Sequence, residues 1–441
     1  MGLDTDKYEI IADSEGLREI RESIGYGITA GATESDQNYI RGLEICIRNK
    51  ETEECTEMKS VRFSINRKVT TAIDHEAFDS GIDPEIYETM LEKSFAYSGN
   101  IARFAKVFEK AANGESITVG HIGGSITQGA VSGHSRQYSW ARLSHEWLTK
   151  QFPDAEIGFV NAGIGGTPSD YGNFRGQPHL LSHDPDIVFI EFSVNNNSLN
   201  EVHKESYEAL LRAALNDEKE PAVALVISVL ATDHAVSQAM EFAEYYGVPV
   251  INVDEGVFYG VDAGELTIAE YAPDTIHPYE WGHRIMADMA IRFYEKMIAL
   301  VDSASADDKI QLPVPSAPLS GCYFGDLIYC DGGSFTPDAL GGWTVTDVVD
   351  NGDLHDKHAN LYRGKKAWSG ETGDVMSFTL DAKSITLLVD SGSITVTVNG
   401  ESTVYNNLNQ FCTIVANETS GEVNVEIRAG SDCVIYGFAY N

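Results

Sequence analysis

The sequence contains few cysteines and no long apolar run. Its six cysteines among 441 residues show no CxxC spacing. Reduced thiols are therefore expected rather than a disulfide or zinc framework. No run of about 18 consecutive apolar residues occurs, so the sequence predicts no membrane-spanning helix. The stretch MGLDTDKYEII carries neither a basic nor an apolar leader region, which favours a cytoplasmic protein.

Basic residues are also scarce. The chain has 31 lysines and arginines against 67 aspartates and glutamates, a formal net charge of −36 at pH 7. A chain of this charge repels phosphate backbones and anionic membrane surfaces, so nucleic acid and membrane are excluded as expected partners. A neutral sugar polymer is not repelled.

The middle of the chain alternates short apolar runs with amphipathic stretches. The runs are ITVGHI, EIGFVNAG, DIVFIEFS, AVALVISV and VPVINVD, all rich in β-branched residues. Continuously apolar strands are typical of a parallel sheet covered by helices on both faces. We therefore predict a three-layer α/β/α domain over residues 96–310. Residues 1–95 form an N-terminal extension with short strands, to which the sequence assigns no fold.

The last quarter of the chain has a different period. QLPVPSAPLSG, residues 311–321, carries three prolines and is expected to be a stiff, extended linker. Beyond it, SITVTVNG and GEVNVEIRAG alternate apolar and polar residues, with Ile394, Val396 and Val398 on one face of the first. Residues 322–441 are therefore predicted to form an antiparallel β-sandwich.

Polar groups suited to acyl transfer follow the predicted parallel strands. Ser125 lies in GGSITQG, Gly166 in NAGIGGTPS, Asn195 in SVNNNS, and both Asp274 and His277 in DTIHP. A serine needs a histidine to take its proton, and the histidine needs a carboxylate to orient it. The developing oxyanion needs backbone N–H groups and an amide. The carboxyl ends of parallel strands bring such groups together.

Other interpretations of these motifs are weaker. The glycine loop around Ser125 ends in Thr-Gln-Gly rather than the Gly-Lys-Ser/Thr of a phosphate-binding loop, and its glycines do not form GxGxxG. Asp274 and His277 lack a clustered third ligand, so we expect neither metal nor organic cofactor. Arg175 follows the Gly166 motif, and we expect it in a solvated loop. Asn161 is either a turn residue or a cross-loop donor.

Together the motifs resemble those of the SGNH, or GDSL, hydrolase superfamily. GGSIT, NAGIGG, SVNN and DTIH match its four signature blocks in order, over about residues 115–300. The resemblance implies a flavodoxin-like parallel sheet and a serine esterase. It implies the catalytic residues Ser125, Asp274 and His277. It assigns the oxyanion hole to Ser125, Gly166 and Asn195.

Three positions depart from the superfamily pattern. Gly124 stands where many members have aspartate, Ser193 where the third block usually has glycine, and Asn196 where that block usually has aspartate. These departures favour the GGSIT branch, which is rich in carbohydrate esterases. The added β-sandwich, with a jelly-roll and carbohydrate-binding-module-like character, is most similar to the two-domain mannan acetylesterases of carbohydrate esterase family 17. That similarity implies removal of O-acetyl groups from plant polysaccharides or oligosaccharides, above all acetylated mannan.

Two questions stay open at this point. In the β-sandwich, Trp343 and Trp368 are either sugar-stacking anchors or core residues, and the surrounding DLHDKHANLYRGKKAW is rich in groups that bond hydroxyls. The resemblance suggests that this domain leans over the active site.

Two other functions remain: an esterase or thioesterase for lipid or small-molecule esters, and a sugar-binding protein with an inactive hydrolase domain. The oligomeric state is not predicted.

Overall fold

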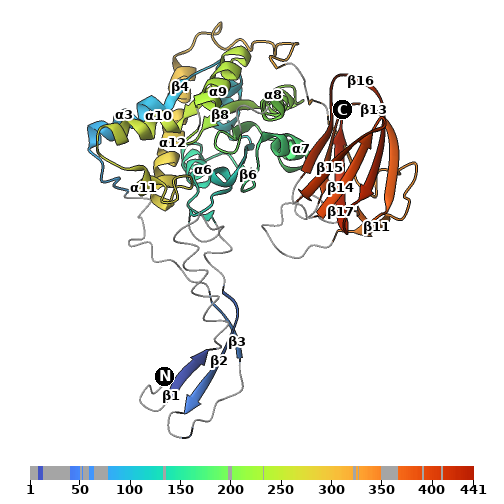
Figure 1. Ribbon diagram of the computed structural model, residues 1–441. Helices are drawn as coiled ribbons and strands as arrows, with labels where there is room; N and C mark the ends of the chain where they lie inside the picture. The colour runs from blue at the N-terminus through green and yellow to red at the C-terminus, as the bar shows by residue number, and fades with distance from the viewer. Residues whose placement is uncertain are drawn as a thin grey trace.

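The computed structural model places three bodies along the chain (Figure 1). It describes residues 8–12, 40–49, 52, 59–63, 78–132, 136–196, 201–231, 233–320, 324–325, 327–348, 366–389, 392–408 and 411–441. We call the second body the α/β domain and the third the β domain. In Figure 1 they lie side by side, with a small N-terminal sheet below them.

The α/β domain is built on a six-stranded sheet in the order β4-β9-β8-β7-β5-β6. All neighbours run parallel except β4, which pairs antiparallel with β9 at one edge. The strands are β4 (Phe95–Tyr97), β5 (Ile117–Gly123), β6 (Ile157–Gly163), β7 (Ile187–Glu191), β8 (Ala222–Ile227) and β9 (Val250–Asn252). All five predicted apolar runs form strands of this sheet, which confirms the predicted fold class.

Helices cover both faces of the sheet, and each face has its own apolar core. One core involves α3 (Pro84–Ser94), α4 (Ala102–Ala112), α6 (Trp140–Gln151), α10 (Val253–Asp262), α11 (Ile268–Tyr271) and α12 (Glu280–Ser303). The other involves α8 (Glu201–Leu215), α9 (Asp233–Tyr246) and the short η2 (Leu181–His183). The methionines of α12 are fully buried, as helical spacing predicts for a core face.

The strand order places a topological switch point where the chemistry is expected. Strand β5 lies between β6 and β7, so the connections leaving β5 and β7 diverge to opposite sides of the sheet. In open α/β sheets, ligands bind outside the carboxyl ends of the strands at such a switch point. Here those ends carry the nucleophile loop after β5 and the Asn195 turn after β7.

The β domain is a single, strongly bent antiparallel sheet in the order β11-β12-β17-β13-β16-β14-β15, with β10 paired to β17. Its alternating residues point inward as predicted: Ile394, Val396, Val423, Val425 and Ile427 are at most 2% exposed. The strands are β10 (Ile328–Cys330), β11 (Thr344–Asp347), β12 (Lys366–Gly370), β13 (Val375–Val389), β14 (Gly392–Val398), β15 (Glu401–Leu408), β16 (Phe411–Ala429) and β17 (Cys433–Tyr440).

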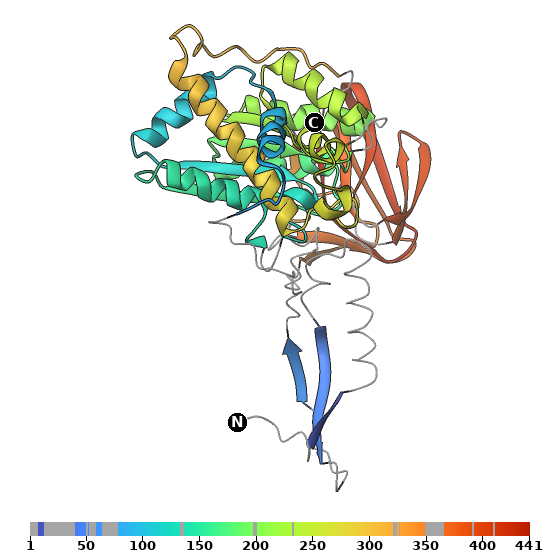
Figure 2. The ribbon, with the colours of Figure 1, turned by 90° about the vertical axis from the view of Figure 1, so that its left-hand side faces the viewer.

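In Figure 1, helix α7 (Ser169–His179) lies on the side of the α/β domain that faces the β domain. Figure 2 looks from the opposite side, the left-hand side of Figure 1, where the long helix α12 crosses in front. Tyr171 and Phe174 of α7 form an apolar cluster with Leu388 and Ala439 of the β domain. Asn173 also donates from Nδ2 to the carbonyl of Phe324, 2.9 Å away. Helix α7 directly follows the Gly166 loop. The β domain therefore packs against a helix that begins near the carboxyl ends of the parallel strands.

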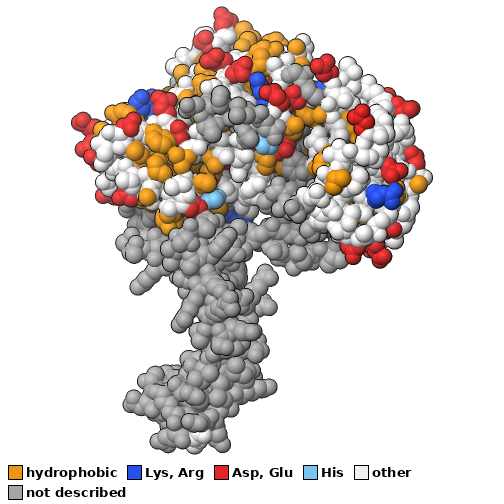
Figure 3. All heavy atoms as spheres, in the orientation of Figure 1, with side chains coloured by type: hydrophobic (Ala, Val, Ile, Leu, Met, Phe, Trp, Pro, Cys, Tyr) orange, Lys and Arg blue, Asp and Glu red, His pale blue; other side chains and the backbone are white. Residues whose placement is uncertain are grey.

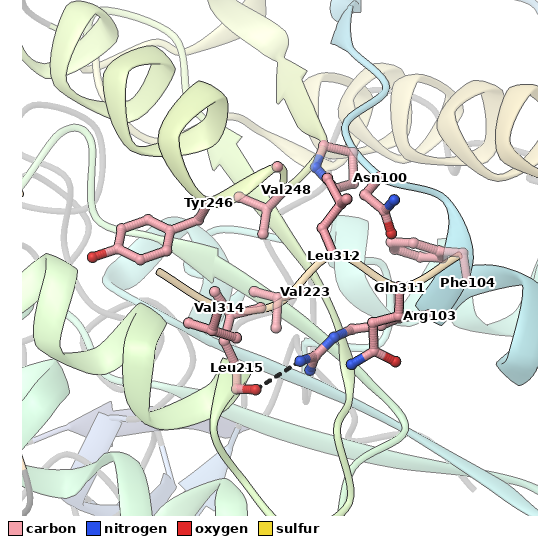
Figure 4. Close-up of a pocket in the computed structure, with 12 residues that line it drawn as sticks. Asn100, Arg103, Phe104, Leu215, Val223, Tyr246, Val248, Gln311, Leu312 and Val314 are labelled. Carbon is pink, nitrogen blue, oxygen red and sulfur yellow. Dashed lines mark hydrogen bonds between the residues drawn. The ribbon is translucent and has the colours of Figure 1, made fainter. Parts of the chain in front are cut away.

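The proline-rich segment, residues 311–321, is held against the α/β domain by hydrogen bonds and apolar contacts. The guanidinium of Arg212 donates to the carbonyls of Pro315 and Ser316, and buried Glu208 accepts from the amide of Ser320 at 2.7 Å. Figure 4 shows Leu312 and Val314 lying over Arg103, Val223 and Tyr246. These contacts fix the path of the chain between the two domains.

The N-terminal extension contributes a three-stranded antiparallel sheet, in the order β1-β2-β3. Its strands are β1 (Tyr8–Ala12), β2 (Ile40–Asn49) and β3 (Lys59–Phe63). In the space-filling view, acidic side chains are spread over the visible face of the two larger domains, with few basic ones (Figure 3). None of the described helices is long and apolar enough to cross a membrane.

Candidate active site

Ser125 is the first residue of the short helix α5 (Ser125–Gln128), immediately beyond β5. The chain turns sharply there because Gly123 and Gly124 leave room for close contacts. A Cβ at Gly123 would approach the Glu191 carbonyl and the Thr127 hydroxyl to 2.4 Å, and one at Gly124 would approach Asn195 Oδ1 to 2.0 Å. Ser125 itself is 8% exposed. The predicted glycine loop is therefore a close-packed support for one hydroxyl.

His277 and Asp274 meet Ser125 as an unbroken hydrogen-bonded chain. The Ser125 Oγ lies 2.7 Å from His277 Nε2, and His277 Nδ1 lies 2.6 Å from Asp274 Oδ2. A carboxylate only accepts, so Nδ1 carries the ring proton and Nε2 is free to accept from the serine hydroxyl. This is the arrangement that general-base activation of a serine requires.

The loop between Asp274 and His277 is shaped by a left-handed residue. Thr275 has φ +70°, an uncommon conformation for a threonine. The turn directs the amides of Ile276 and His277 at Asp274 Oδ1, at 2.9 and 2.7 Å. The carboxylate is thus held from one side by the backbone and from the other by the imidazole.

These contacts decide the charge of Asp274. Partial burial raises the pKa of the carboxyl, but hydrogen bonds from the His277 ring and from the two amides outweigh it and lower the pKa to about 2. The carboxylate is therefore ionised across neutral pH, where it can orient the imidazole and stabilise an imidazolium.

Asn195, predicted as an oxyanion donor, lies beside the residue that precedes Ser125. Its amide packs against Gly124, the residue before Ser125, as the 2.0 Å approach to a Gly124 Cβ shows. A tight turn after β7 sets this position, with the amides of Asn195 and Asn196 both donating to the Phe192 carbonyl. A larger residue at position 124 would require the Asn195 side chain to shift.

The Gly166 loop reaches the same point from β6. A Cβ at Gly165 would lie 3.5 Å from the Ser125 Cβ, so this turn runs beside the serine. Gly166 has φ +67°, a conformation that favours glycine. Asn161 donates from Nδ2 to the Thr127 carbonyl at 2.8 Å. Its Oδ1 also accepts from the amide of Gly163 at 2.9 Å, so Asn161 is both a turn residue and a donor to a neighbouring loop.

Arg175 was expected in a solvated loop, and this expectation is wrong. The residue lies on α7 and is fully buried. Its guanidinium donates to the Gly123 carbonyl at 2.9 Å and to the Ala162 carbonyl, at the ends of β5 and β6. Burial lowers the pKa of Arg175 to about 10. The sequence offered no signal for this role, since the residue precedes Gly176 in a helix of low apolar content.

The expected sugar contacts of the β domain are not supported. Trp343 and Trp368 are 2% and 0% exposed and belong to the core of the bent sheet. An indole packed on both faces by its own domain cannot stack on a pyranose ring, so the assignment of both as sugar anchors is wrong. Residues 353–365 of the polar stretch before Trp368 lie outside the described residues.

Potential metal ligands are not gathered at the site. Within the part of the chain that the structure describes, no group of three or more His, Cys, Asp or Glu side chains could hold a metal ion. The polar groups that do converge are one hydroxyl, one imidazole, one carboxylate, one amide and a glycine turn. This set can activate a serine and receive an oxyanion.

Comparison with known proteins agrees with this arrangement. Residues 121–285 match the model of the GDSL-like lipase/acylhydrolase family. Two crystal structures of a two-domain esterase active on acetylated mannans, one co-crystallised with mannopentaose, are similar to this chain at 26% identity, with TM-scores of 0.67 and 0.68. The match covers 79% of this chain and 97% of that esterase. No curated protein sequence matches the chain.

Proposed function

We propose that this chain, an ester hydrolase of the GDSL-like lipase/acylhydrolase family, removes O-acetyl groups from mannan-type oligosaccharides or polysaccharides. The observation that carries the proposal is the hydrogen-bonded chain from Ser125 through His277 to Asp274. The similarity to the mannan-active esterase supports the substrate class because it extends over both domains of that enzyme. A neutral glycan also suits a chain of net charge −36.

In the first half of the proposed reaction, the Ser125 Oγ attacks the acetyl carbonyl carbon while its proton passes to His277 Nε2. Asp274 holds the imidazolium that forms. The N–H groups of Ser125 and Gly166 and the amide of Asn195 bind the oxyanion of the tetrahedral intermediate. The bond to the sugar oxygen then breaks, His277 returns the proton to that oxygen, and the deacetylated sugar leaves.

In the second half, water hydrolyses the acetyl-serine. His277 takes a proton from the water as its oxygen bonds to the acetyl carbon. The intermediate collapses to acetate, and the proton returns to the Ser125 Oγ. The geometry needs no further reactant, since the His277 ring already contacts both the hydroxyl and the carboxylate.

The test is acetate release from acetylated manno- and xylo-oligosaccharides by the wild type and by Ser125→Ala. We expect release from the mannan series, with turnover in the variant lower by about 10⁵-fold or more. Unchanged release by Ser125→Ala would overturn the nucleophile. A wild type that cleaves aryl acetates but neither glycan would overturn the carbohydrate assignment, and a series of aryl esters with longer acyl chains would then define the true acyl group.

A further inference from the structure

A second carboxyl group lies under the site, and the proposed reaction does not use it. Glu191 ends β7 and is 1% exposed, inside the otherwise apolar run DIVFIEFS. Among the described residues, no basic side chain lies within ion-pair distance of it. A buried carboxyl without a cation needs a structural or functional reason, because burial of the charge is costly.

Two hydroxyl groups donate hydrogen bonds to this carboxyl, and a third hydroxyl, that of Ser228, lies beside it. The Thr127 hydroxyl donates to Glu191 Oε2 at 3.2 Å, and the Ser193 hydroxyl donates to Oε1 at 3.2 Å. Ser193 in turn accepts from the amide of Ser228 at 2.8 Å, where β8 ends. Burial raises the pKa of Glu191, whereas the hydroxyls of Ser228, Thr127 and Ser193 and the amide of Ser193 lower it.

The two hydroxyls belong to the segments that carry the chemistry. Thr127 lies two residues beyond Ser125 on α5, and Ser193 lies two residues before Asn195. The carboxyl therefore joins the turn of the nucleophile to the turn of the oxyanion amide. The segments also touch directly, since a Cβ at Gly123 would meet both the Glu191 carbonyl and the Thr127 hydroxyl at 2.4 Å.

We propose that Glu191 is a positioning residue for ester hydrolysis, which fixes Ser125 through Thr127 and Asn195 through Ser193. This inference rests on the proposed function of Ser125 and Asn195. It also gives a role to Ser193, which stands where relatives usually have glycine. A glycine would keep only the link from the backbone amide of residue 193 to Glu191, and the Ser193 hydroxyl adds a second one.

The need for such a link follows from the local structure. Helix α5 has only four residues, too few to be stable by its own hydrogen bonds. A nucleophile and an oxyanion donor must nevertheless be held within about 0.5 Å of the productive geometry. A carboxyl that accepts from both segments supplies that precision without touching the substrate. Its loss is expected to lower kcat much more than it changes KM.

The experiment compares Glu191→Ala, Glu191→Gln and Thr127→Val, with p-nitrophenyl acetate as substrate and thermal unfolding as the stability readout. We expect Glu191→Ala to lower kcat about 10- to 100-fold with KM within about twofold. Glu191→Gln can bond both hydroxyls, and we expect it to restore kcat to within about fivefold of the wild type. Thr127→Val, similar in shape, should lower kcat about 3- to 10-fold.

A matched control is Ser144→Ala in α6. Its buried hydroxyl donates only to the Ala141 carbonyl, at 3.2 Å, and has no contact with Glu191. We expect kcat of this variant to equal that of the wild type. Wild-type kcat in Glu191→Ala would overturn the proposal. A well-folded Glu191→Gln as impaired as Glu191→Ala would also overturn it, because charge and not the hydrogen-bonded link would then matter.

The design separates this inference from the proposed function. If Glu191→Ala does not fold, Thr127→Val and Ser193→Ala decide, and wild-type kcat in both overturns the link. Wild-type turnover by Ser125→Ala would instead show that the nucleophile is misassigned, and the positioning role would fall with it. A wild type that cleaves p-nitrophenyl acetate but not acetylated mannan would overturn only the assignment of the sugar substrate. The kcat values of the Glu191 variants on p-nitrophenyl acetate would still test the positioning role.

Discussion

The α/β domain and the β domain place their most distinctive side chains in opposite environments. At the carboxyl edge of the parallel sheet, Asp274 and His277 keep 15% and 17% of their side chains exposed, beside an 8% exposed Ser125. In the β domain, Trp343 and Trp368 are packed inside the bent sheet. The first set is held by hydrogen bonds to named partners, and the second by apolar contacts alone.

This difference shows which residue types identify a site. Polar side chains that converge from separate strand ends need a reason, because each could have been solvated or replaced without loss of packing. Large aromatic side chains need none, since burial in a core is their ordinary use. A triad is therefore strong evidence for a site, whereas tryptophans in a sugar-rich context are weak evidence for a subsite.

After Ser125→Ala, the largest expected loss of activity comes from changing Asp274 to asparagine. The amide can keep the contacts to the Ile276 and His277 amides, but it can donate to Nδ1 and favour the wrong tautomer. We expect kcat to fall about 10²- to 10⁴-fold, with a modest loss of thermal stability at neutral pH. Steady-state kinetics on p-nitrophenyl acetate measures this.

Asp288→Asn is the matched control for that variant. Asp288 is a similarly shielded carboxylate on α12, which accepts from Tyr87 at 2.7 Å and pairs with Arg284. We expect it to lose some stability but keep its activity. If the two variants lost activity equally, Asp274 would have no special part in the reaction.

The next largest loss of activity is expected when Asn195 is replaced. Alanine there removes one oxyanion donor and leaves the chain from Ser125 to Asp274 intact, so kcat should fall about 10²- to 10³-fold. Asn173→Ala, which removes the interdomain bond to the Phe324 carbonyl, serves as the comparison and should keep its kcat. An Asn195→Ala enzyme with an unchanged rate would contradict the oxyanion assignment.

A third variant tests whether Trp368 of the β domain is a core residue or a sugar-stacking one. Trp368→Leu replaces a fully buried indole by a smaller apolar group, so we expect unfolding to become about 2–4 kcal/mol easier. Affinity for manno-oligosaccharides should not change, because the ring is not accessible to them. Urea unfolding measures the first, and calorimetric titration in a Ser125→Ala background measures the second. A selective loss of sugar affinity would restore the stacking hypothesis.

Most of the α/β domain could be predicted because its strands are continuously apolar and its helices have a clear period. The triad could be predicted because three of the motifs lie at the ends of neighbouring parallel strands, and the fourth, DTIH, directly precedes the last helix of the domain. The burial of Arg175 could not be predicted, since nothing in the sequence shows that the β domain covers α7. Glu191 carried a signal that was not used: a carboxylate inside an apolar strand requires buried donors.

The β domain and the N-terminal extension were less predictable. Alternation identified the inward residues of β14 and β16 but could not separate a core tryptophan from a sugar-facing one, since both occupy apolar positions. Residues 1–95 suggested strands with a charged turn, and the structure places β2 and β3 there. Strand β1, Tyr8–Ala12, belongs to the same segment and pairs with β2, but periodicity alone does not show which strands pair.

The smallest expected effect concerns acid stability and again contrasts the two domains. The folded pKa of Asp274, about 2, lies below the usual value of an aspartate. A carboxyl with a lowered folded pKa contributes stability above the unfolded pKa, and this contribution is lost as the pH falls toward the folded pKa. The stability advantage of the wild type over Asp274→Asn should therefore be full above about pH 5 and shrink between pH 4 and pH 2.

Asp381→Asn provides the β-domain reference for that measurement, because Asp381 is an exposed carboxylate on β13 without an imidazole partner among the described residues. Urea unfolding of the three proteins at pH 6, 4 and 3 gives the differences. A wild-type advantage over Asp274→Asn that stayed constant to pH 3 would mean that His277 and the two amides do not hold the charged carboxylate. The hydrogen bonds that orient His277 would then contribute nothing measurable to stability. Asp274 would in that case not differ from the β-domain core, which apolar contacts alone hold together.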